Sequence, residues 1–343
     1  MEKIIVTGGA GYIGSHTVVE LQQAGFEVII IDNLSNSRVE VISGIEKITG
    51  MRPHFENLDC LDYIGLDNFL KKHEGVKAII HFAASKAVGE SVEKPLLYYR
   101  NNLVSLMNLL ELMPVHGIKN IVFSSSCTVY GQPDELPVSE NAPIKPALSP
   151  YGNTKQVCEE IIRDTLHAGK SMKAILLRYF NPIGAHPSAL IGELPNGVPN
   201  NLVPFITQTA IGLRKQLSVF GNDYNTPDGS CIRDYINVVD LAKAHVTAMK
   251  RMLDNQSEES VEVFNLGTGR GLSVIEIIDI FQKVNGVEVP HKIVGRRDGD
   301  IERVWANPER ANKVLGWTAV ESIEETLRSA WTWEKRLAEE KSK

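Results

Sequence analysis

A glycine-rich segment near the start of the chain constrains the fold more than any other feature. The string Thr7-Gly8-Gly9-Ala10-Gly11-Tyr12-Ile13-Gly14 follows a β-branched apolar run and opens a helical pattern. In this context Gly8 permits a tight turn, Gly11 leaves the backbone bare where a pyrophosphate approaches, and Gly14 lets helix and strand pack closely. The helix N-terminus then faces the phosphate anion. The segment therefore predicts a strand, a turn and a helix that bind a dinucleotide.

An acidic residue follows at the distance that this kind of site requires. Asp32 ends the second apolar run, where a carboxylate accepts hydrogen bonds from the adenosine ribose hydroxyls and repels a 2′-phosphate. A strand-terminal Asp that only caps a turn is the alternative. Because Asp32 occurs together with the glycine segment, we predict that the cofactor is NAD rather than NADP.

Short apolar runs alternate with helical patterns through the first half of the chain. We expect strands at 3–7, 27–32, 77–83, 119–125 and 173–178, and helices at 13–24, 96–113 and 151–166, the second of which ends before Pro114. Strands that read as near-continuous apolar runs are buried on both faces, as in a parallel sheet covered by helices. The pattern predicts an α/β fold with a Rossmann doubly wound parallel sheet.

The composition of the sequence changes after Asn181. Residues 182–204 are rich in Pro, Gly and Asn, which is typical of a region built from loops. Beyond them we expect a helix at 239–252, a strand at 261–266 and a helix at 273–284. We therefore assign residues 1–180 to an NAD-binding Rossmann domain and residues 181–343 to a smaller C-terminal α/β substrate domain, some segments of which return to the first domain.

Composition argues against several classes of function. The 343 residues are 43% hydrophobic, as in an ordinary globular enzyme, and the net charge of -6 disfavours a nucleic-acid partner. No run of 18 apolar residues and no signal-peptide pattern occurs, so we expect a cytoplasmic protein with no membrane partner. Four cysteines without CxxC spacing, and histidines without an HExxH motif, predict free thiols and no metal.

A second glycine cluster, Gly267-Thr268-Gly269-Arg270-Gly271, also lies between an expected strand and an expected helix. Ser273 and Glu276 form a capping box for that helix, which explains the local sequence without a ligand. No ribose-binding acid follows at the right distance. We therefore predict no second nucleotide site there.

Tyr151 and Lys155 lie four residues apart at the start of an expected helix, so both side chains project from one face. A nearby ammonium favours the phenolate form of a tyrosine and makes it a usable base near neutral pH. The pair follows a strand that ends in Ser124-Ser125-Ser126, and ligands bind at the carboxyl ends of parallel strands. Ser126 is placed to donate a hydrogen bond to a reacting hydroxyl, although a serine that satisfies backbone groups remains the alternative for its neighbours.

The glycine segment, Ser126 and the Tyr151-x-x-x-Lys155 pair together resemble the extended short-chain dehydrogenase/reductase family and, within it, the UDP-hexose 4-epimerases. The string LRYFNPIGAHPS, residues 177–188, is the most specific part because no generic structural reason makes it recur. The matching stretches span nearly the whole chain: 7–16, 81–95, 123–131, 149–155, 177–188, 199–202, 220–224, 233–235 and 297–300.

The resemblance implies an isomerase with a tightly bound NAD that interconverts UDP-glucose and UDP-galactose through a transient 4-keto-hexose. By resemblance, Tyr151 takes the proton from the sugar O4, Lys155 tunes the phenol and holds the nicotinamide ribose, and Ser126 bridges to O4. The family also implies a homodimer formed by helices of the NAD domain, a UDP-hexose as the partner molecule, and a place in galactose metabolism.

The resemblance also assigns binding residues. The NAD contacts are expected from Gly8, Gly11, Tyr12, Ile13, Gly14, Asp32, Asn33, Leu34, Ser35, Asn36, Ser37, Asp59, Cys60, Phe82, Ala83, Ala84, Ser85, Lys86, Asn101, Ser126, Tyr151, Lys155 and Phe180. The UDP-sugar contacts are expected from Lys86, Ser126, Tyr151, Asn181, Asn201, Leu202, Val219, Phe220, Arg233, Tyr235, Arg297, Asp300 and Val304. The arginines suit the pyrophosphate because a guanidinium binds phosphate oxygens in a bidentate manner.

Three departures from the family pattern bear on function. Ala84 and Ser85 replace a common Gly-Leu pair, and Cys127 follows Ser126 where alanine is frequent; neither change removes a catalytic group. Val304 stands where many members have a bulky tyrosine that closes the sugar pocket. A smaller side chain leaves room beside the C2 substituent, so UDP-GlcNAc and UDP-GalNAc are further candidate substrates.

Three other functions are alternatives. An NDP-sugar 4,6-dehydratase needs an Asp-Glu pair after the hydroxyl residue, and Cys127 and Thr128 occupy that place. A UDP-glucuronate 4-epimerase needs only one changed pocket residue and stays open. A non-catalytic NAD-binding module would not need both Tyr151 and Lys155, so their joint presence argues against it.

Overall fold

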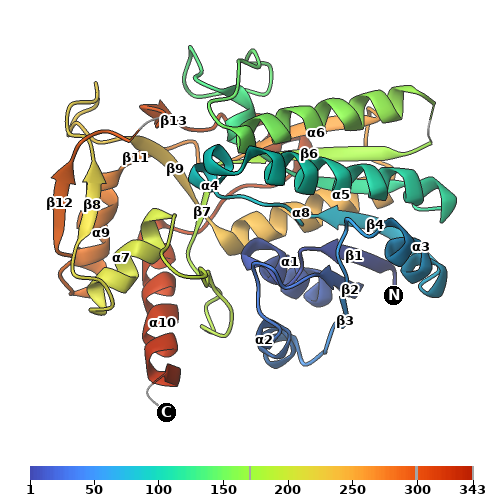
Figure 1. Ribbon diagram of the computed structural model, residues 1–343, viewed down its shortest axis with the longest axis horizontal. Helices are drawn as coiled ribbons and strands as arrows, with labels where there is room; N and C mark the ends of the chain where they lie inside the picture. Colours follow the sequence, from blue (N-terminus) through green and yellow to red (C-terminus); the bar gives the residue numbers. More distant parts are fainter. Residues whose placement is uncertain (170, 298–299, 342–343) are drawn as a thin grey trace.

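Seven parallel strands form the centre of the molecule in the order β10-β6-β5-β4-β1-β2-β3 (Figure 1). The computed structural model describes residues 1–169, 171–297 and 300–341. The strands of this sheet are β1 (Lys3–Thr7), β2 (Glu27–Asp32), β3 (His54–Asn57), β4 (Val76–His81), β5 (Asn120–Ser126), β6 (Lys173–Tyr179) and β10 (Val261–Leu266). The predicted α/β fold with a doubly wound parallel sheet is confirmed.

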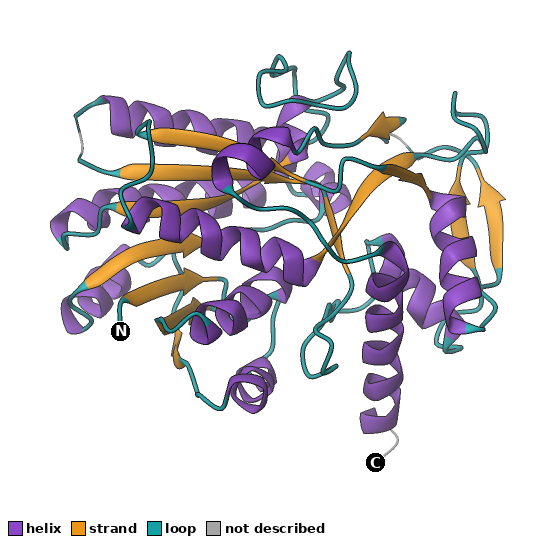
Figure 2. Ribbon diagram, turned by 180° about the vertical axis from the view of Figure 1, so that it is seen from behind, coloured by secondary structure: helices purple, strands orange, loops and turns teal. Residues whose placement is uncertain are grey.

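Helices cover both faces of this sheet (Figure 2). One face carries α1 (Tyr12–Gln23), α2 (Glu40–Thr49) and α8 (Val238–Leu253), and the other carries α3 (Tyr63–Lys72), α5 (Pro95–Val115) and α6 (Pro150–His167). Side chains alternate between these two cores along each strand, so Ile4 and Val6 face α1 whereas Ile5 faces the opposite layer. This two-sided burial explains why the strands read as unbroken apolar runs.

The remaining elements are smaller and lie mostly beyond the carboxyl edge of the sheet. They are α4 (Val88–Glu93), the 3-10 turn η1 (Cys127–Tyr130), β7 (Asn181–Ile183), α7 (Leu202–Ala210), β8 (Leu217–Phe220), β9 (Ile232–Asn237), β11 (Gly271–Ser273), α9 (Val274–Asn285), β12 (His291–Val294), β13 (Arg303–Val304), the π-turn η2 (Ala311–Leu315) and α10 (Ile323–Lys341). Strands β11, β9, β13 and β7 form one sheet, and β12 pairs with β8. Trp331, Phe281 and Ile277 belong to a separate core beneath them.

The strands 3–7, 27–32 and 261–266 begin and end where the sequence predicts. The helix expected to stop before Pro114 instead includes that proline in its last turn. Pro114 costs little there because the helix ends one residue later, so few backbone hydrogen bonds are forfeited. β4 ends two residues early, at His81, although the Phe82 amide still donates to the Thr7 carbonyl at 3.0 Å.

Residues beyond 180 contribute to both parts of the molecule. α8 packs on α1, and β10 pairs with β6 at the edge of the central sheet. The loop expected over 182–204 is shorter than predicted, because β7 includes its first residues and α7 its last. The division of the chain at residue 180 stays a prediction.

Among the described residues, no helix has the length and apolarity that crossing a bilayer requires.

Candidate active site

The glycine segment forms a tight turn between β1 and α1. Gly8 has a φ of +71°, and a Cβ there would lie 2.7 Å from the Ala83 nitrogen. A Cβ on Gly14 would lie 2.2 Å from the Gly8 carbonyl oxygen, so the helix approaches the turn too closely for any side chain. Gly11 caps α1 without a side chain, and the amides of the first helical turn have no intrahelical acceptor. The result is a bare, positively polarised helix end.

Asp32 connects this turn to the loop that follows β2. Its Oδ2 accepts a hydrogen bond from the Ala10 amide at 3.0 Å, while Oδ1 accepts from the Leu34 amide at 2.9 Å and the Ser37 hydroxyl at 2.8 Å. Asn33 donates to Asp59 Oδ2 at 2.9 Å. The predicted adenosine-end residues therefore meet at the carboxyl ends of β1, β2 and β3. Among them Cys60 is buried, and Asn33, Ser35 and Asn36 are exposed.

The loop after β4 is held against α5 and α6. The buried Asn102 accepts from the Ser85 amide at 2.8 Å and donates to the Thr154 hydroxyl at 3.0 Å, which in turn donates to the Tyr151 carbonyl. Asn101 donates to the Ser85 hydroxyl at 3.1 Å. Asn102 is thus a positioning residue that the sequence analysis missed. The signal that would have indicated it is a group of polar residues, Asn102, Ser105 and Asn108, on the buried face of α5.

Ser126, Tyr151 and Lys155 come together at the carboxyl end of β5. Their exposed fractions are 6%, 8% and 3%, and the Ser126 side chain lowers the pKa of the Tyr151 phenol against the larger effect of burial. The Lys155 ammonium donates to the Ser124 carbonyl at 2.7 Å and lies 5.9 Å from the centroid of the Tyr151 ring. Pro150 at the first helical position and Ser149, whose hydroxyl accepts from the Gly152 amide, fix the start of α6.

Burial dominates the electrostatics of this cluster. It raises the pKa of Tyr151 and lowers the pKa of Lys155 to about 8. The effect of Lys155 on the Tyr151 phenolate stays a prediction. Burial, rather than the ammonium, is the largest effect on the pKa of the phenol, and the ammonium is bound to the Ser124 carbonyl.

The residues predicted to bind the nucleotide form two groups. In the first, Arg297 donates to Asp300 at 2.6 Å and lies over the Phe220 ring at 5.3 Å, and Arg233 lies 4.0 Å from the same carboxylate. Val304 pairs with Arg233 in the β13–β9 ladder and belongs to a small apolar cluster with Phe180. Cys127 packs against that cluster.

The second group surrounds Glu193, an acid that the sequence analysis did not single out. Its Oε1 accepts from Asn201 at 2.5 Å and lies 3.7 Å from the Lys86 ammonium, which is 5.9 Å from the Tyr12 ring. The Tyr12 hydroxyl donates to the Gly184 carbonyl. No local pattern predicts Glu193, because its ion-pair partner Lys86 lies far away in the sequence.

Four other predicted substrate residues lie on β7, β8, β9 and α7. Asn181 pairs with Tyr235 across the β7–β9 ladder. Val219 and Tyr235 are buried in the core of this part of the molecule, and Leu202 packs against the same core. The side chains of Val219 and Tyr235 therefore point into this core.

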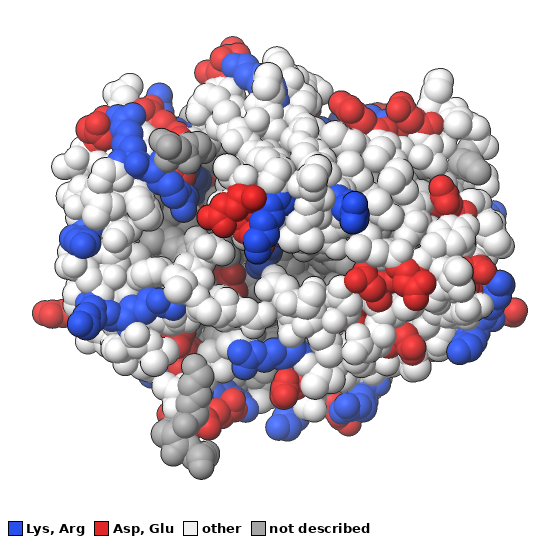
Figure 3. All heavy atoms as spheres, in the orientation of Figure 1, with Lys and Arg blue, Asp and Glu red and all other residues white. Residues whose placement is uncertain are grey.

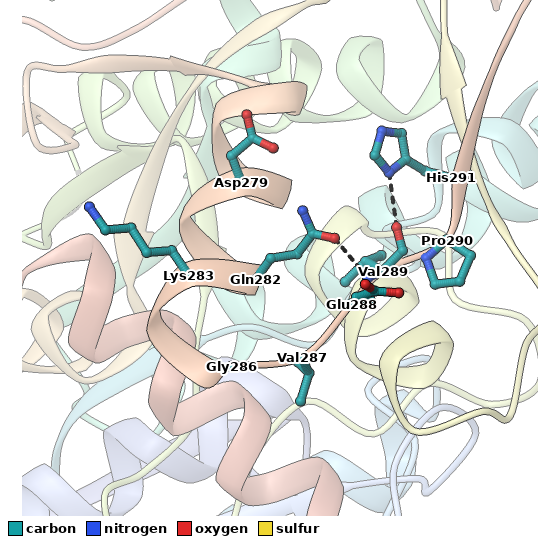
Figure 4. Close-up of a pocket in the computed structure, with 9 residues that line it drawn as sticks. All are labelled: Asp279, Gln282, Lys283, Gly286, Val287, Glu288, Val289, Pro290 and His291. Carbon is teal, nitrogen blue, oxygen red and sulfur yellow. Dashed lines mark hydrogen bonds between the residues drawn. The ribbon is translucent and has the colours of Figure 1, made fainter.

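One face of the molecule is hollowed near its middle, with acidic and basic side chains around the hollow (Figure 3). A separate open hollow of about 760 Å³ lies between α9 and the segment that leads to β12, and it is lined by Asp279, Gln282, Lys283, Gly286, Val287, Glu288, Val289, Pro290 and His291 (Figure 4). None of the predicted site residues lines this second hollow.

Within the described ranges, no group of His, Cys, Asp and Glu side chains is arranged to hold a metal ion.

The second glycine cluster has the structure that its sequence predicts. Ser273 caps α9, and both hydrogen bonds of the capping box with Glu276 are present. The amides of Thr268 and Gly269 donate to Asp234 at 2.9 and 3.1 Å. These amides are therefore satisfied by a protein carboxylate.

Comparison with known proteins agrees with this geometry. The family described as GDP-mannose 4,6 dehydratase matches residues 5–330. The UDP-glucose 4-epimerase of Mus musculus is 49% identical over 342 residues, which cover 98% of this chain and 97% of that protein. The enzyme of the same name from Bacillus subtilis (strain 168) is 50% identical over 331 residues, or 96% of each chain.

Solved structures give the same result. The UDP-glucose 4-epimerase from Stenotrophomonas maltophila, with bound NAD and formylated UDP-arabinopyranose, is 45% identical, covers 99% of this chain and 100% of its own, and has a TM-score of 0.95. The enzyme from Bifidobacterium longum, in complex with NAD⁺ and UDP, is also 45% identical, covers 97% and 98%, and has a TM-score of 0.93.

The parallel sheet, the glycine turn and the Tyr151–Lys155 pair at its carboxyl edge define a protein of the extended short-chain dehydrogenase/reductase class. At about half identity over nearly its full length, the chain belongs to the UDP-glucose 4-epimerase family.

The Gly14 contact generates a first prediction. Gly14→Ala forces a methyl group into the Gly8 carbonyl, so we expect the free energy of unfolding to fall by about 1–3 kcal/mol in a urea titration. Gly89→Ala is the matched control, because Gly89 lies in α4 with open space around it and should change stability by about 1 kcal/mol or less. Equal stability of the Gly14→Ala variant and the parent would contradict the close approach.

Proposed function

We propose that the protein is an isomerase, an NAD-dependent 4-epimerase that interconverts UDP-glucose and UDP-galactose. One observation carries the proposal: Ser126, Tyr151 and Lys155 meet at the carboxyl edge of the sheet in a chain about half identical to UDP-glucose 4-epimerases. Neighbouring structures of that enzyme hold NAD and UDP. The chemistry is removal and return of hydrogen at the sugar C4.

The residues around the glycine turn fit NAD. The space at Gly11 and the unpaired amides at the start of α1 suit a pyrophosphate, and the Asp32 carboxylate suits the ribose hydroxyls. We assign the loops after β2, β3 and β4, with Asn101 and Phe180, to the rest of the cofactor. When bound, NAD supplies a hydride acceptor that returns the hydride within the same turnover.

The side chains of this protein manage the proton. Tyr151 accepts the proton of the sugar O4 and later gives it back, and Ser126 bridges the phenol and O4. The raised pKa of Tyr151 falls when a cation binds beside the phenol, as an oxidised nicotinamide would. Lys155 fixes the end of β5 and adds a positive charge on the same face of α6.

The nucleotide must be held firmly while the keto-hexose turns over in the pocket. We assign this grip to Arg233 and Arg297 on the pyrophosphate, with Asp300 holding the two guanidinium groups and Phe220 beneath one of them. Asn181, Tyr235, Leu202, Val219 and the Lys86–Glu193–Asn201 group complete the proposed site.

A direct assay tests this function. Purified protein incubated with UDP-galactose, without added NAD, is expected to form UDP-glucose, because the cofactor stays bound. Tyr151→Phe is expected to lose at least about 100-fold in kcat while it retains NAD, since general acid–base catalysis contributes that much. Chromatography of the sugar nucleotides measures the first result, and NAD released on denaturation measures the second. Undiminished turnover by the variant would refute the assigned base.

The same assay separates the alternatives. UDP-glucuronate as the preferred substrate would indicate the related 4-epimerase. Dehydration is disfavoured because Cys127 occupies the place of an acid, and burial raises the pKa of its thiol to about 12. The absence of turnover with bound NAD would leave a non-catalytic binding module.

We further propose that the sugar pocket admits an acetamido group at C2. Val304 is 2% exposed and packs in the cluster with Phe180 and Cys127, and we assign its short side chain to the wall of the proposed sugar pocket because Phe180 is assigned to the cofactor beside it. One neighbour, the UDP-Glc/GlcNAc 4-epimerase of Campylobacter jejuni, is 36% identical, covers 98% of this chain and 100% of its own, and has a TM-score of 0.83.

This proposal predicts turnover of UDP-GalNAc by the parent protein. Val304→Tyr is expected to lower kcat/KM for UDP-GalNAc at least about tenfold through steric exclusion and to leave UDP-galactose turnover within about threefold. Kinetics on both substrates with both proteins measure the ratio. Turnover of UDP-glucose and UDP-galactose alone by the parent would sink the idea.

We also propose a homodimer. Helices α4 and α5 expose Val92, Leu96 and Leu97 at 62%, 80% and 49%, which is typical of a surface that a second copy covers. Light scattering distinguishes a dimer from the 38.0 kDa monomer. A cytoplasmic location and a place in galactose metabolism stay predictions.

A further inference from the structure

We propose that Glu159, paired with Arg178, is a positioning residue of the reaction: it fixes the register of α6 on β5 and places a carboxylate one helical turn from Lys155. The inference rests on the proposed function for its kinetic consequences. The pair lies outside the residues that touch substrate or cofactor in the scheme above, and nothing in the sequence pattern marks it.

The pair is buried and has two hydrogen bonds. Arg178 Nε donates to Glu159 Oε1 at 2.8 Å, and Nη2 donates to Oε2 at 2.5 Å. The exposed fractions of the two side chains are 4% and 6%. Such a pair contributes little net stability compared with apolar packing, because both charges are desolvated. Its position therefore calls for a role other than stabilising the core.

The position of the pair fixes two elements of the active site. Tyr151, Lys155 and Glu159 follow one another at intervals of four on α6, so they share a face. Lys155 donates to the Ser124 carbonyl, and Glu159 Oε1 accepts from the Ser125 hydroxyl at 2.6 Å. α6 is thus attached to two consecutive residues of β5 that directly precede Ser126. A shift of α6 along the strand would break both contacts and move Tyr151 away from Ser126.

The pair is held from two further elements. Arg178 Nη1 donates to the Tyr130 hydroxyl at 3.0 Å, and that hydroxyl donates to Asn265 Oδ1 at 2.6 Å. Tyr130 ends η1, which follows Ser126, and Asn265 belongs to β10. All of these side chains are buried. The carboxylate of Glu159 therefore has a fixed place from which to act on the catalytic face.

Glu159 also places a negative charge one helical turn from Lys155, although Arg178 and Arg163, whose Nη2 lies 3.6 Å from Glu159 Oε2, share that charge. The titratable groups that face the ammonium are Tyr151, Cys158 and Glu159 on α6 and His81 on β4. Burial raises the pKa of Cys158 to about 12 and lowers that of His81 to about 3, so both are neutral near pH 7. Tyr179 of β6 is neutral too and binds the Ser124 hydroxyl. Cys158 and, to a smaller extent, Glu159 raise the pKa of Lys155 against the larger effect of burial.

The test is the pH dependence of kcat for UDP-galactose. Glu159→Gln keeps the size of the side chain and an acceptor for Ser125 but removes the charge. We expect the alkaline limb of the profile, where Lys155 loses its proton, to move to lower pH by about 0.5–1 unit. Glu159→Asp keeps the charge and should leave the limb in place. Titration of [¹³C]lysine-labelled protein by NMR, with Lys155→Met to assign the signal, reads the same shift without turnover.

Glu262→Gln is the matched control. Glu262 and Arg251 form a second buried pair with two hydrogen bonds of 2.8 Å, away from the catalytic face. Its loss should lower the melting temperature and leave the alkaline limb unchanged. Ser125→Ala removes only the hydroxyl contact, so kcat should fall about 2- to 10-fold with no shift of the limb.

Each outcome decides something. If Glu159→Gln changes neither the alkaline limb of the kcat profile nor the Lys155 titration, the electrostatic effect of Glu159 on Lys155 is overturned. If Ser125→Ala leaves kcat unchanged, the positioning role is overturned. If Glu159→Gln does not fold, loss of kcat in Ser125→Ala still supports positioning and its absence opposes it. A parent protein that does not epimerise would refute the proposed function, while the NMR titration would still judge the effect of Glu159 on Lys155.

Discussion

The site depends on how α6 is attached to the end of β5. Lys155 and Glu159 bind two consecutive residues of the strand, Ser124 and Ser125, and the Glu159–Arg178 pair locks that contact from β6. Because the start of α6 carries Tyr151 and the end of β5 carries Ser126, this attachment sets the geometry in which a proton moves. A helix held by apolar contacts alone could shift by a fraction of a turn, whereas directional bonds at two adjacent residues forbid it.

The central sheet supplies the rest by topology. Its strand order reverses direction between β1 and β4, which opens a crevice at the carboxyl ends of the strands. The glycine turn, the Asp32 carboxylate and the loop after β4 meet there, and Asn102 joins that loop to α6. β7, β9 and β13 then bring Asn181, Arg233 and Val304 towards the same edge. One side of the crevice is thus suited to a dinucleotide and the other to a nucleotide sugar.

Local patterns predicted most of the central strands because burial on both faces makes their sequences apolar, and the capping box of α9 is likewise local. The edge strand β3 was not predicted, because none of its residues is buried. The glycine turn was predictable for the same reason, since only glycine tolerates the contacts at positions 8 and 14. The pKa of Tyr151 depends on packing, because burial raises it and the spacing of Tyr151 and Lys155 does not show how deeply the phenol is buried. Glu193 and Asn102 were missed because the pairs Lys86–Glu193 and Asn102–Thr154 join residues that are distant in the chain. The individual binding residues of both ligands stay predictions.

The central claim is that the protein holds one cofactor and returns the same hydrogen to C4, while Tyr151 handles only the proton. The most direct measurement follows the label of UDP-[4-²H]galactose incubated with the protein and unlabelled NAD in ordinary water. The account predicts that the UDP-glucose formed keeps deuterium at C4 and that the added NAD gains none. Loss of deuterium to water, or its transfer to free NAD, would contradict it.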